Sequence, residues 1–307
     1  MLRTESEIQN SINTWLSSVF DEETKTRIQE FQSNNPDELK DSFYKNLEFG
    51  TGGMRGIMGV GTNRINKYTL GKNTQGLSDY LHKTYPNQAI KTVIAFDCRH
   101  NSKEFAQIVA DVFSANSIEV FLFEDLRATP ELSFALKHLG CQCGIVLTAS
   151  HNPPEYNGYK VYWEDGGQLV PPFDGEIIDV INTLEYSDIN FAANTNLIHT
   201  IGKDVDDVFI DASVKSGSLE VNTAKNRENL SVVFTALHGT SITAVPETLK
   251  RAGYTNVNLV EAQSKPDGNF PTVKSPNPEE PEALKMALDL ANEVQADIVI
   301  GTDPDCD

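Results

Sequence analysis

The fold is decided by residues 91–147, which read KTVIAFDCRHNSKEFAQIVADVFSANSIEVFLFEDLRATPELSFALKHLGCQCGIVL. Three short apolar runs in this stretch have the length and composition of buried strands: 91–96, 118–123 and 143–147. The two segments between them, 102–116 and 129–139, have the spacing of amphipathic helices. Strands and helices that alternate in this way form an open, mainly parallel sheet with helices on both faces. The sequence therefore predicts an α/β fold.

The same alternation continues on both sides of this stretch. A helix is expected at 67–84, before the first strand. A second alternating set of strands and helices is expected towards the C-terminus, at 231–235, 241–252, 257–260, 278–294 and 297–300. With 307 residues, the chain is long enough for two domains. We expect two consecutive α/β/α domains, each with a mixed, mainly parallel sheet.

The remaining segments set the expected domain bounds. Residues 1–48 are predicted to form an N-terminal helical arm, because Asn35-Pro36 is a helix start and apolar residues recur every four positions after it. Residues 50–61 contain six glycines in twelve positions and are predicted to be a loop. The polar, Asn-rich segment 187–200 is predicted to be the linker between domain I, 49–200, and domain II, 201–307.

Composition excludes several classes of function. The formal net charge is −19, which disfavours binding to nucleic acid or to an anionic membrane. The apolar runs are far shorter than the ~20 residues that span a bilayer, and no apolar signal region follows Met1. A cytoplasmic protein with reduced thiols is expected. The pair Cys141-x-Cys143 is a weak metal candidate, because no second Cys/His pair stands nearby.

A serine follows the strand 143–147, in the segment TASHNP (148–153). Ligands of doubly wound sheets bind outside the carboxyl ends of the strands, so Ser150 has a catalytic position. The residues leave three interpretations open: a hydrolase nucleophile with His151 as base, a plain turn before two prolines, and a phosphoserine. The hydrolase is disfavoured, because neighbouring side chains on an extended segment point apart and no Gly-x-Ser-x-Gly elbow is present.

Three carboxylates follow the strand 297–300, in the segment GTDPDCD (301–307). If the segment is extended, Asp303, Asp305 and Asp307 lie on one side and repel one another unless a cation with oxygen ligands, such as magnesium, joins them. A phosphate on Ser150 would add further oxygens to this site. The alternatives are an EF-hand loop, a phosphatase with an aspartate nucleophile, and an acidic turn; the EF-hand lacks its preceding helix.

Basic residues near these segments are candidates for phosphate binding. Arg55 stands in the glycine-rich segment and can present a planar fork to an oxyanion. Lys160, between two tyrosines, is a candidate for proton transfer. Arg99 follows the strand 91–96 and is expected either to order the serine segment or to pair with Asp97. His238, at the start of an expected helix, is assigned no catalytic role.

Taken together, these segments resemble the α-D-phosphohexomutase family, which includes phosphoglucomutases and phosphomannomutases. The segments that carry the resemblance are FGTGGMRG (49–56), TASHNP (148–153), NGYK (157–160) and GTDPDCD (301–307). The resemblance implies that Ser150 carries the phosphate, that Arg55 and Lys160 lie in the active site and that His151 assists binding or proton transfer. It also implies one Mg²⁺ per active site, held by Ser150, Asp303, Asp305 and Asp307, and a sugar bisphosphate as activator.

Further segments resemble the branch that contains phosphoglucomutase 2-like enzymes and phosphopentomutases. These are YKVYW (159–163), FPTV (270–273) and PNPEE (276–280). The resemblance implies an intramolecular phosphotransferase, an isomerase of carbohydrate metabolism that acts on a small sugar phosphate through a phosphoserine and a bisphosphate intermediate. A phosphoglucomutase is expected, with a phosphopentomutase or a phosphomannomutase as the alternatives.

The resemblance covers the N-terminal domains of the family only. The family's third domain, with its sugar-reading Gly-Glu-x-Ser-Gly-His loop, and its fourth, with a phosphate-binding loop, have no match in the sequence. We therefore expect an incomplete second domain, no domains III and IV, and little turnover by this chain alone. The alternative function for the chain itself is a non-catalytic scaffold that binds metal and phosphate. The sequence does not indicate an oligomeric state.

Overall fold

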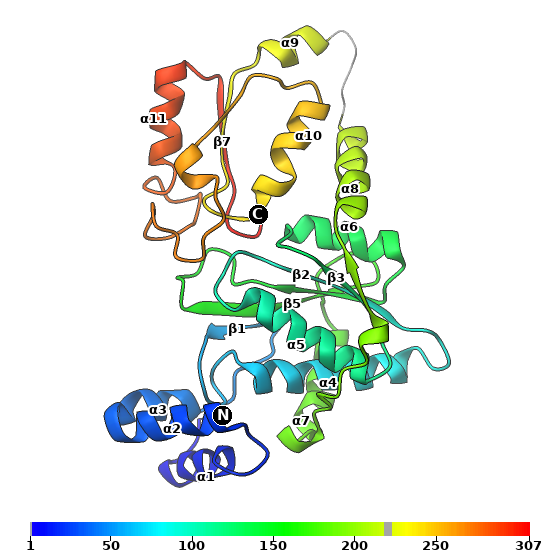
Figure 1. Ribbon diagram of the computed structural model, residues 1–307, viewed down its shortest axis with the longest axis vertical. Coiled ribbons are helices and arrows are strands. Elements are labelled where there is room, and N and C mark those ends of the chain that lie inside the picture. Colours follow the sequence, from blue (N-terminus) through cyan, green and yellow to red (C-terminus); the bar gives the residue numbers. More distant parts are fainter. Residues whose placement is uncertain (1, 218–222) are drawn as a thin grey trace.

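The computed structural model describes residues 2–217 and 223–307. The chain begins with a helical arm, as the sequence predicted, made of α1 (Glu5–Trp15), α2 (Glu22–Asn34) and α3 (Pro36–Phe43). Side chains cap these helices: Thr4 forms a capping box with Glu7, and Asp21 accepts the Thr24 N–H at 2.9 Å. Figure 1 shows the arm at one end of the molecule, below the first sheet.

The first domain is built on a six-stranded sheet with the order β1-β5-β4-β2-β3-β6. Its strands are β1 (Gly53–Ile57), β2 (Lys91–Phe96), β3 (Glu119–Phe123), β4 (Cys143–Leu147), β5 (Tyr156–Trp163) and β6 (Ile198–Ile201). Strands β4, β2, β3 and β6 are parallel, whereas β5 runs antiparallel to both β4 and β1. The predicted mixed, mainly parallel sheet is therefore confirmed.

Helices cover both faces of this sheet. The helices of this domain are α4 (Lys67–Thr84), α5 (Ser102–Ala115), α6 (Thr129–Leu139) and α7 (Phe173–Thr183). The larger apolar cluster joins the sheet to α4, α5 and α7, and a smaller cluster joins its other face to α6 and α8 (Lys203–Ser216). The inner strand β4 is buried at every position, as its continuous apolar sequence requires.

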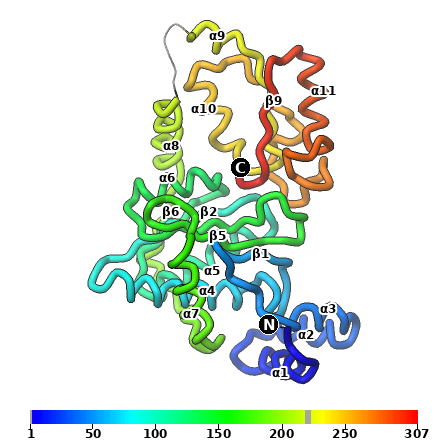
Figure 2. Tube along the Cα trace, turned by 180° about the vertical axis from the view of Figure 1, so that it is seen from behind, coloured from blue at the N-terminus to red at the C-terminus, as the bar shows by residue number. Residues whose placement is uncertain are grey.

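The second domain contains a parallel three-stranded sheet with the order β8-β7-β9. Its regular elements are α9 (Ala224–Asn229), β7 (Val232–Thr235), α10 (Val245–Arg251), β8 (Val257–Leu259), α11 (Lys285–Val294) and β9 (Ile298–Gly301). Short 3-10 turns complete the fold, at Tyr186–Asp188, Thr195–Leu197, Thr240–Thr243 and Glu261–Gln263. In both views, the chain end labelled C lies on the side of this domain that faces the first sheet (Figure 1, Figure 2).

Three segment predictions were wrong. The glycine-rich segment contains a strand, β1, because its glycines permit close pairing with β5: a Cβ on Gly53 would lie 1.9 Å from the Tyr159 carbonyl oxygen. Segment 187–200 ends in the edge strand β6, whose exposed polar residues carry no apolar pattern. The expected helix 278–294 starts only at Lys285, because Pro281 lacks an N–H donor and interrupts it.

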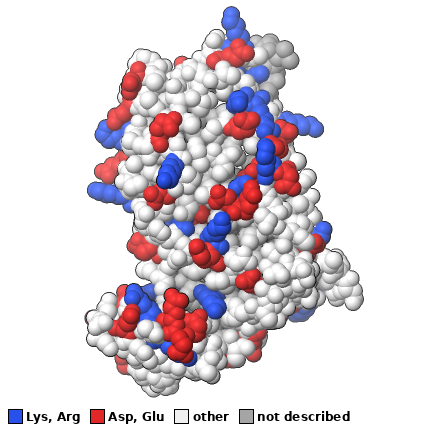
Figure 3. Space-filling model, in the orientation of Figure 1, with Lys and Arg blue, Asp and Glu red and all other residues white. Residues whose placement is uncertain are grey.

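Two surface features bear on the expected partners. On the face in Figure 3, acidic and basic side chains lie intermingled rather than in one basic field. Within residues 2–217 and 223–307, no helix combines the length and the apolar composition needed to cross a lipid bilayer.

The arm is anchored to the first domain by an aromatic cluster around Trp15. The indole is fully buried and stacks on Phe20 at 4.5 Å between ring centroids. It also meets Phe43 of α3, Tyr68 of α4 and Tyr186 edge-on. Because Tyr68 and Tyr186 belong to the first domain, this side chain packs the arm against the rest of the molecule.

We predict that Trp15→Ala lowers the free energy of unfolding by about 3–5 kcal/mol, because it removes a buried aromatic side chain and leaves a cavity. Urea unfolding followed by circular dichroism measures the change. The matched control is Val19→Ala in the same arm, where the side chain is 44% exposed and the expected change is within about 0.5 kcal/mol. Equal effects of the two variants would contradict this role of Trp15.

Candidate active site

The candidate site lies where the loop after β4 meets the loop after β9. The first is the serine loop (148–153), which follows β4 in the first sheet. The second is the aspartate loop (301–307), which follows β9 in the second sheet. Both loops stand at carboxyl ends of parallel strands, which is where sheets of this kind bind ligands. The two domains therefore contribute to one site.

Ser150 is held at the centre of this meeting point. Its side chain is buried, and its backbone adopts the left-handed conformation with φ 52°. The Ser150 hydroxyl donates to Asp305 Oδ1 at 2.7 Å, and Lys160 Nζ donates to Ser150 Oγ at 3.0 Å. A left-handed serine is uncommon and is retained where the surrounding structure enforces it. The hydroxyl oxygen thus lies between the carboxylate of Asp305 and the ammonium of Lys160.

The Asp305 carboxylate accepts hydrogen bonds from several side chains of the first domain, and the sequence did not predict all of them. Lys160 Nζ lies 2.7 Å from Asp305 Oδ2, and the Thr129 hydroxyl donates to the same oxygen at 2.6 Å. The Thr129 backbone N–H, at the first position of α6, donates to the Asp305 carbonyl oxygen at 3.0 Å. Burial opposes ionisation of Asp305, but the ammonium of Lys160 and these hydrogen bonds hold its pKa below the ordinary value.

Thr129 was missed by the reasoning from sequence. One signal was present, because Thr129 follows the end of β3 and opens a helix, and the carboxyl ends of β3 and β4 share one edge of the sheet. Nothing in the local sequence, however, shows that this threonine faces a residue 176 positions away.

Arg99 orders the serine loop, as one of its two predicted roles required. Its guanidinium lies beneath the loop and donates only to backbone carbonyl oxygens of this region. The acceptors are Pro153 at 2.8 Å, Tyr156 at 3.1 Å, Ser150 at 2.6 Å and Asn152. Carbonyl groups turned inward need such donors when they are buried. The planar fork of arginine supplies them together.

Asp97 is the counter-ion of this arrangement, so the second predicted role of Arg99 also holds. Arg99 Nε lies 3.4 Å from Asp97 Oδ2, and both side chains are buried. Thr148 and Ser102 donate to the Asp97 carboxylate at 2.6 and 2.8 Å. Thr148 Oγ1 in turn accepts the Ser150 N–H at 2.9 Å. A continuous polar chain therefore connects the end of β2 to the backbone of Ser150.

Arg55 and His151 lie further from the serine hydroxyl. Arg55, on β1 opposite Gly158, is exposed and donates to the Asn152 side chain at 2.7 Å. It therefore borders the serine loop, and within residues 2–217 and 223–307 its other guanidinium donors have no hydrogen-bond partner. His151 is exposed, and its ring makes no hydrogen bond within the described part of the chain. The structure brings Ser150, Lys160 and Asp305 into contact, with Arg55 at the rim.

The aspartate loop is a turn rather than the extended segment that we expected. Asp303 Oδ1 accepts the N–H groups of Asp305 at 3.2 Å and Asp307 at 2.8 Å, and the Asp303 N–H donates to the Asp307 carbonyl oxygen at 3.1 Å. Asp303 and Asp305 are buried, whereas Asp307 is exposed. The three carboxylates therefore do not line up on one side, because the backbone of the loop closes on the first of them.

The chemistry of this loop nevertheless fits a hard cation. Burial and, after it, the charge of Asp305 raise the pKa of Asp303 to about 7, so a cation beside this carboxyl would favour its ionised form. Carboxylate and hydroxyl oxygens are the ligands that Mg²⁺ prefers. As the side chains stand, however, no three His, Cys, Asp or Glu residues in the described ranges are grouped so that they could hold a metal ion.

Two other sequence candidates are structural. Cys141 and Cys143 are buried free thiols, and burial raises the pKa of each to about 12, so neither is a ready thiolate ligand. His238 is buried, and its ring nitrogens lie 3.1 Å from the Lys265 carbonyl oxygen and 2.8 Å from Thr272 Oγ1. Its ring therefore fixes the loop before Thr272.

The chain matches family models over most of its length. The model described as phosphoglucomutase/phosphomannomutase, alpha/beta/alpha domain I, matches residues 46–188, and the model of alpha/beta/alpha domain II matches residues 207–307. A phosphoglucomutase of Staphylococcus epidermidis is 38% identical over 302 residues, which are 96% of this chain and 53% of that protein. A phosphoglucomutase of Staphylococcus aureus is 43% identical over 275 residues, which are 88% of this chain and 48% of that protein.

A solved structure shares the fold. The phosphoglucomutase/phosphomannomutase family protein of Burkholderia thailandensis superimposes with a TM-score of 0.65 at 22% identity, over 83% of this chain and 52% of that one. The chain spans about half the length of the curated relatives it matches.

We predict that Arg99→Met lowers the free energy of unfolding by about 3 kcal/mol or more, because it leaves Asp97 as an unpaired buried charge. Guanidinium unfolding measures the change. Arg99→Lys keeps the charge but not the planar fork, so it should recover only part of the loss. The control is Arg27→Met, which removes an exposed pair with Glu30 and should change stability by less than about 1 kcal/mol. A wild-type value for Arg99→Met would refute the positioning role.

Proposed function

The chain belongs to the phosphoglucomutase/phosphomannomutase family, and from this premise we propose that it carries the phosphoryl-transfer part of a sugar-phosphate mutase, with Ser150 as the phosphate-carrying residue. The observation that carries the proposal is the position of the Ser150 hydroxyl, 2.7 Å from Asp305 and 3.0 Å from Lys160. A serine needs such neighbours before it can exchange a phosphoryl group at neutral pH.

In the proposed step, phosphorylated Ser150 transfers its phosphoryl group to a free hydroxyl of a sugar monophosphate. The bond between phosphorus and Ser150 Oγ breaks, a bond from phosphorus to the sugar oxygen forms, and the proton of the sugar hydroxyl passes to water, from which Lys160 is reprotonated after it gives its own proton to Ser150 Oγ. The released serine oxygen takes up a proton, and Lys160 Nζ is within hydrogen-bond distance to supply it. The reverse transfer returns the other phosphate of the bisphosphate to Ser150, so phosphate and protons balance over the cycle.

Charge neutralisation is the main demand of this step, because phosphoryl transfer asks for little covalent chemistry from the protein. A phosphate on Ser150 adds about −1.5 to −2 charges beside Asp305. Lys160 offsets part of that charge, and Arg55 has donors free at the rim of the serine loop. The remaining repulsion between phosphate and carboxylate is the physical reason to expect a cation.

We propose Mg²⁺ as that cation, held by Asp303, Asp305, Asp307 and an oxygen of the phosphorylated Ser150. When bound, such an ion stabilises charge on the transferring group. The clustered carboxylate oxygens of the aspartate loop support this assignment, since such oxygens are the ligands that Mg²⁺ prefers. His151 is proposed to assist substrate binding from the surface of the serine loop.

Glucose phosphate is the proposed substrate, with a sugar bisphosphate as activator, because the similar Staphylococcus proteins are named phosphoglucomutases. A phosphopentomutase and a phosphomannomutase are the alternatives. The chain spans about half of those proteins, so we keep a second function for it: a scaffold that binds phosphate and metal without turnover. A coupled assay with glucose 1-phosphate, Mg²⁺ and glucose 1,6-bisphosphate separates the two functions.

We predict that incubation with glucose 1,6-bisphosphate and Mg²⁺ places phosphate on Ser150, as measured by phosphopeptide mapping with mass spectrometry. Ser150→Ala should abolish that label and lower any measurable turnover by about 10³-fold or more, because the phosphate carrier is lost. The control is Ser33→Ala, which changes an exposed serine in the arm. A serine that stays unmodified, together with full activity of Ser150→Ala, would show that the mechanism is wrong.

We predict that Asp307→Asn weakens Mg²⁺ binding by the phosphorylated chain about tenfold or more, because it removes one of three charged ligands. Isothermal titration with MgCl₂ measures the affinity. Asp307 is exposed, so the substitution should leave folding intact. Asp289→Asn removes an exposed carboxylate paired with Lys285 on α11 and should leave Mg²⁺ binding unchanged. Identical affinities for both variants and the wild type would rule out the aspartate loop as the metal site.

A further inference from the structure

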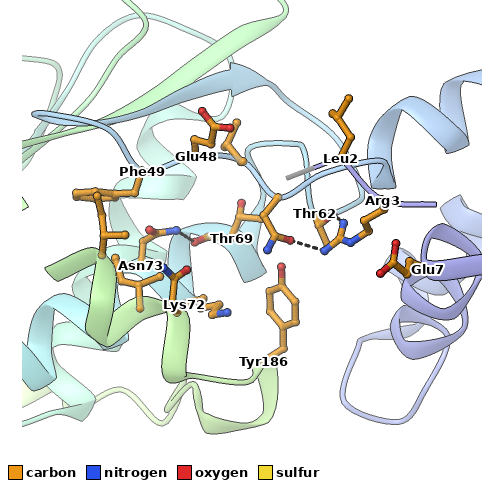
Figure 4. A pocket seen from close by; sticks show the side chains of 15 residues that line it. Leu2, Arg3, Glu7, Glu48, Phe49, Thr62, Thr69, Lys72, Asn73 and Tyr186 are labelled. Carbon is orange, nitrogen blue, oxygen red and sulfur yellow. Dashed lines mark hydrogen bonds between the residues drawn. The ribbon is translucent and has the colours of Figure 1, made fainter. Parts of the chain in front are cut away.

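A cavity of about 410 Å³ lies between the helical arm and the first domain, away from the serine loop. Its walls come from the start of the chain, the segment 46–49, α4, α7 and the turn Tyr186–Asp188. Figure 4 shows Lys72 and Tyr186 directed into the space below Thr69, opposite Arg3. The volume is within the range of small-molecule sites. None of the described residues that line it belongs to the serine or aspartate loop.

Several polar groups in these walls have hydrogen-bonding capacity that the protein does not use. Lys72 is half-buried, with Nζ 5.5 Å from the Tyr186 ring centroid, and it has no hydrogen bond or ion pair within the described ranges. Burial lowers its pKa, while Glu185 and Asp188 oppose that shift. The Tyr186 hydroxyl likewise has no hydrogen-bond partner in the part of the chain that the structure describes. An ammonium and a phenol that are both directed into this cavity (Figure 4) are available to a ligand.

The side chain of Asn73, in the wall of the cavity, limits which ligands the cavity favours. Its side chain is 7% exposed, and Nδ2 donates to the Thr69 carbonyl oxygen at 2.7 Å, the contact drawn in Figure 4. That bond fixes the orientation of the amide, because a carbonyl oxygen cannot accept from Oδ1. Asn73 Oδ1 is then a buried acceptor without a partner among the described residues. The partial negative charge of this unpaired oxygen in the wall disfavours an anionic ligand beside it.

The charges around the cavity also disfavour an anion. Arg3 is engaged with the arm, since it donates to the Phe43 carbonyl, to Thr62 and to Asn46. Among the described residues of the wall, Lys72 is therefore the cation whose hydrogen-bond donors are left for a ligand. The carboxylates of Glu7 and Glu48 line the cavity, and those of Glu185 and Asp188 act on Lys72 from outside it. The charges in the wall sum to zero, because Arg3 and Lys72 balance Glu7 and Glu48, and Glu185 and Asp188 add negative charge near Lys72, so a neutral ligand is favoured.

We propose that this cavity binds a neutral polyhydroxylated small molecule of monosaccharide size, at a site separate from the serine loop. A hydroxyl group donates and accepts at once, so one ligand can accept from Lys72 and donate to the hydroxyl oxygen of Tyr186. The rings of Tyr186 and Phe49 offer the apolar surface that the carbon face of such a ligand needs. Because the walls come from both the arm and the first domain, a bound ligand stabilises their contact.

The test uses D-glucose as the probe and saturation-transfer difference NMR on the whole chain. The wild-type chain should transfer saturation to glucose. Lys72→Met and Tyr186→Phe should each weaken the apparent affinity about fivefold or more, because each removes a hydrogen bond to the ligand. The matched control is Lys91→Met: Lys91 is half-buried over the ring of Phe121 and lies outside the cavity. Thermal melting of each variant confirms that it is folded.

Two further arms make the outcome decisive. Ser150→Ala should bind glucose like the wild type, which separates this cavity from the proposed phosphoryl-transfer site. Inorganic phosphate at the same concentration should not displace glucose. Glucose binding that is absent in the wild type, unchanged in folded Lys72→Met and Tyr186→Phe, or abolished by Ser150→Ala would overturn the proposal. Displacement by phosphate would overturn its charge argument, because the cavity would then prefer an anion.

Discussion

The carboxylate of Asp305 is fully buried where the second domain meets the first, and an ion in such a place has to be paired. Its partners come from the first domain: Lys160 from β5, Thr129 from the start of α6, and Ser150 from the serine loop. One buried acceptor therefore connects three elements of the first domain to the loop that follows β9 in the second. The position of the serine hydroxyl relative to the aspartate loop depends on this pairing.

The serine loop itself is held by a second buried ion. A left-handed serine and several inward carbonyl groups are costly unless donors surround them. Arg99 supplies the donors from below, and Asp97 balances its charge. The close approach of the neighbouring strands adds a steric requirement, because a Cβ on Gly158 would lie 2.5 Å from the Thr148 carbonyl oxygen. The loop that carries the proposed phosphate is thus fixed by charge, hydrogen bonding and packing together.

Local sequence predicted the regular elements well where periodicity was strong. Helices 67–84 and 129–139 and strands 91–96 and 143–147 lie at the expected positions. Two of the failures share a cause, since the strands β1 and β6 each depended on a partner distant in sequence. The glycines of β1 are explained only by the neighbouring strand β5, and the polar strand β6 is explained only by the edge of β3. For the aspartate loop, alternate spacing predicted an extended segment, but hydrogen bonds to Asp303 close it into a turn.

The sequence by itself determined which chemistry is present and near which strand ends it lies: a serine after β4, a lysine on β5 and three aspartates after β9. Periodicity and capping are local properties, so they can be inferred from neighbouring residues. Only the tertiary structure decided which of these groups meet. The contact between Ser150 and Asp305 spans 155 positions, and the cavity beside Lys72 exists because the arm docks on α4 and α7. Such contacts arise from the packing of whole elements, which no local pattern encodes.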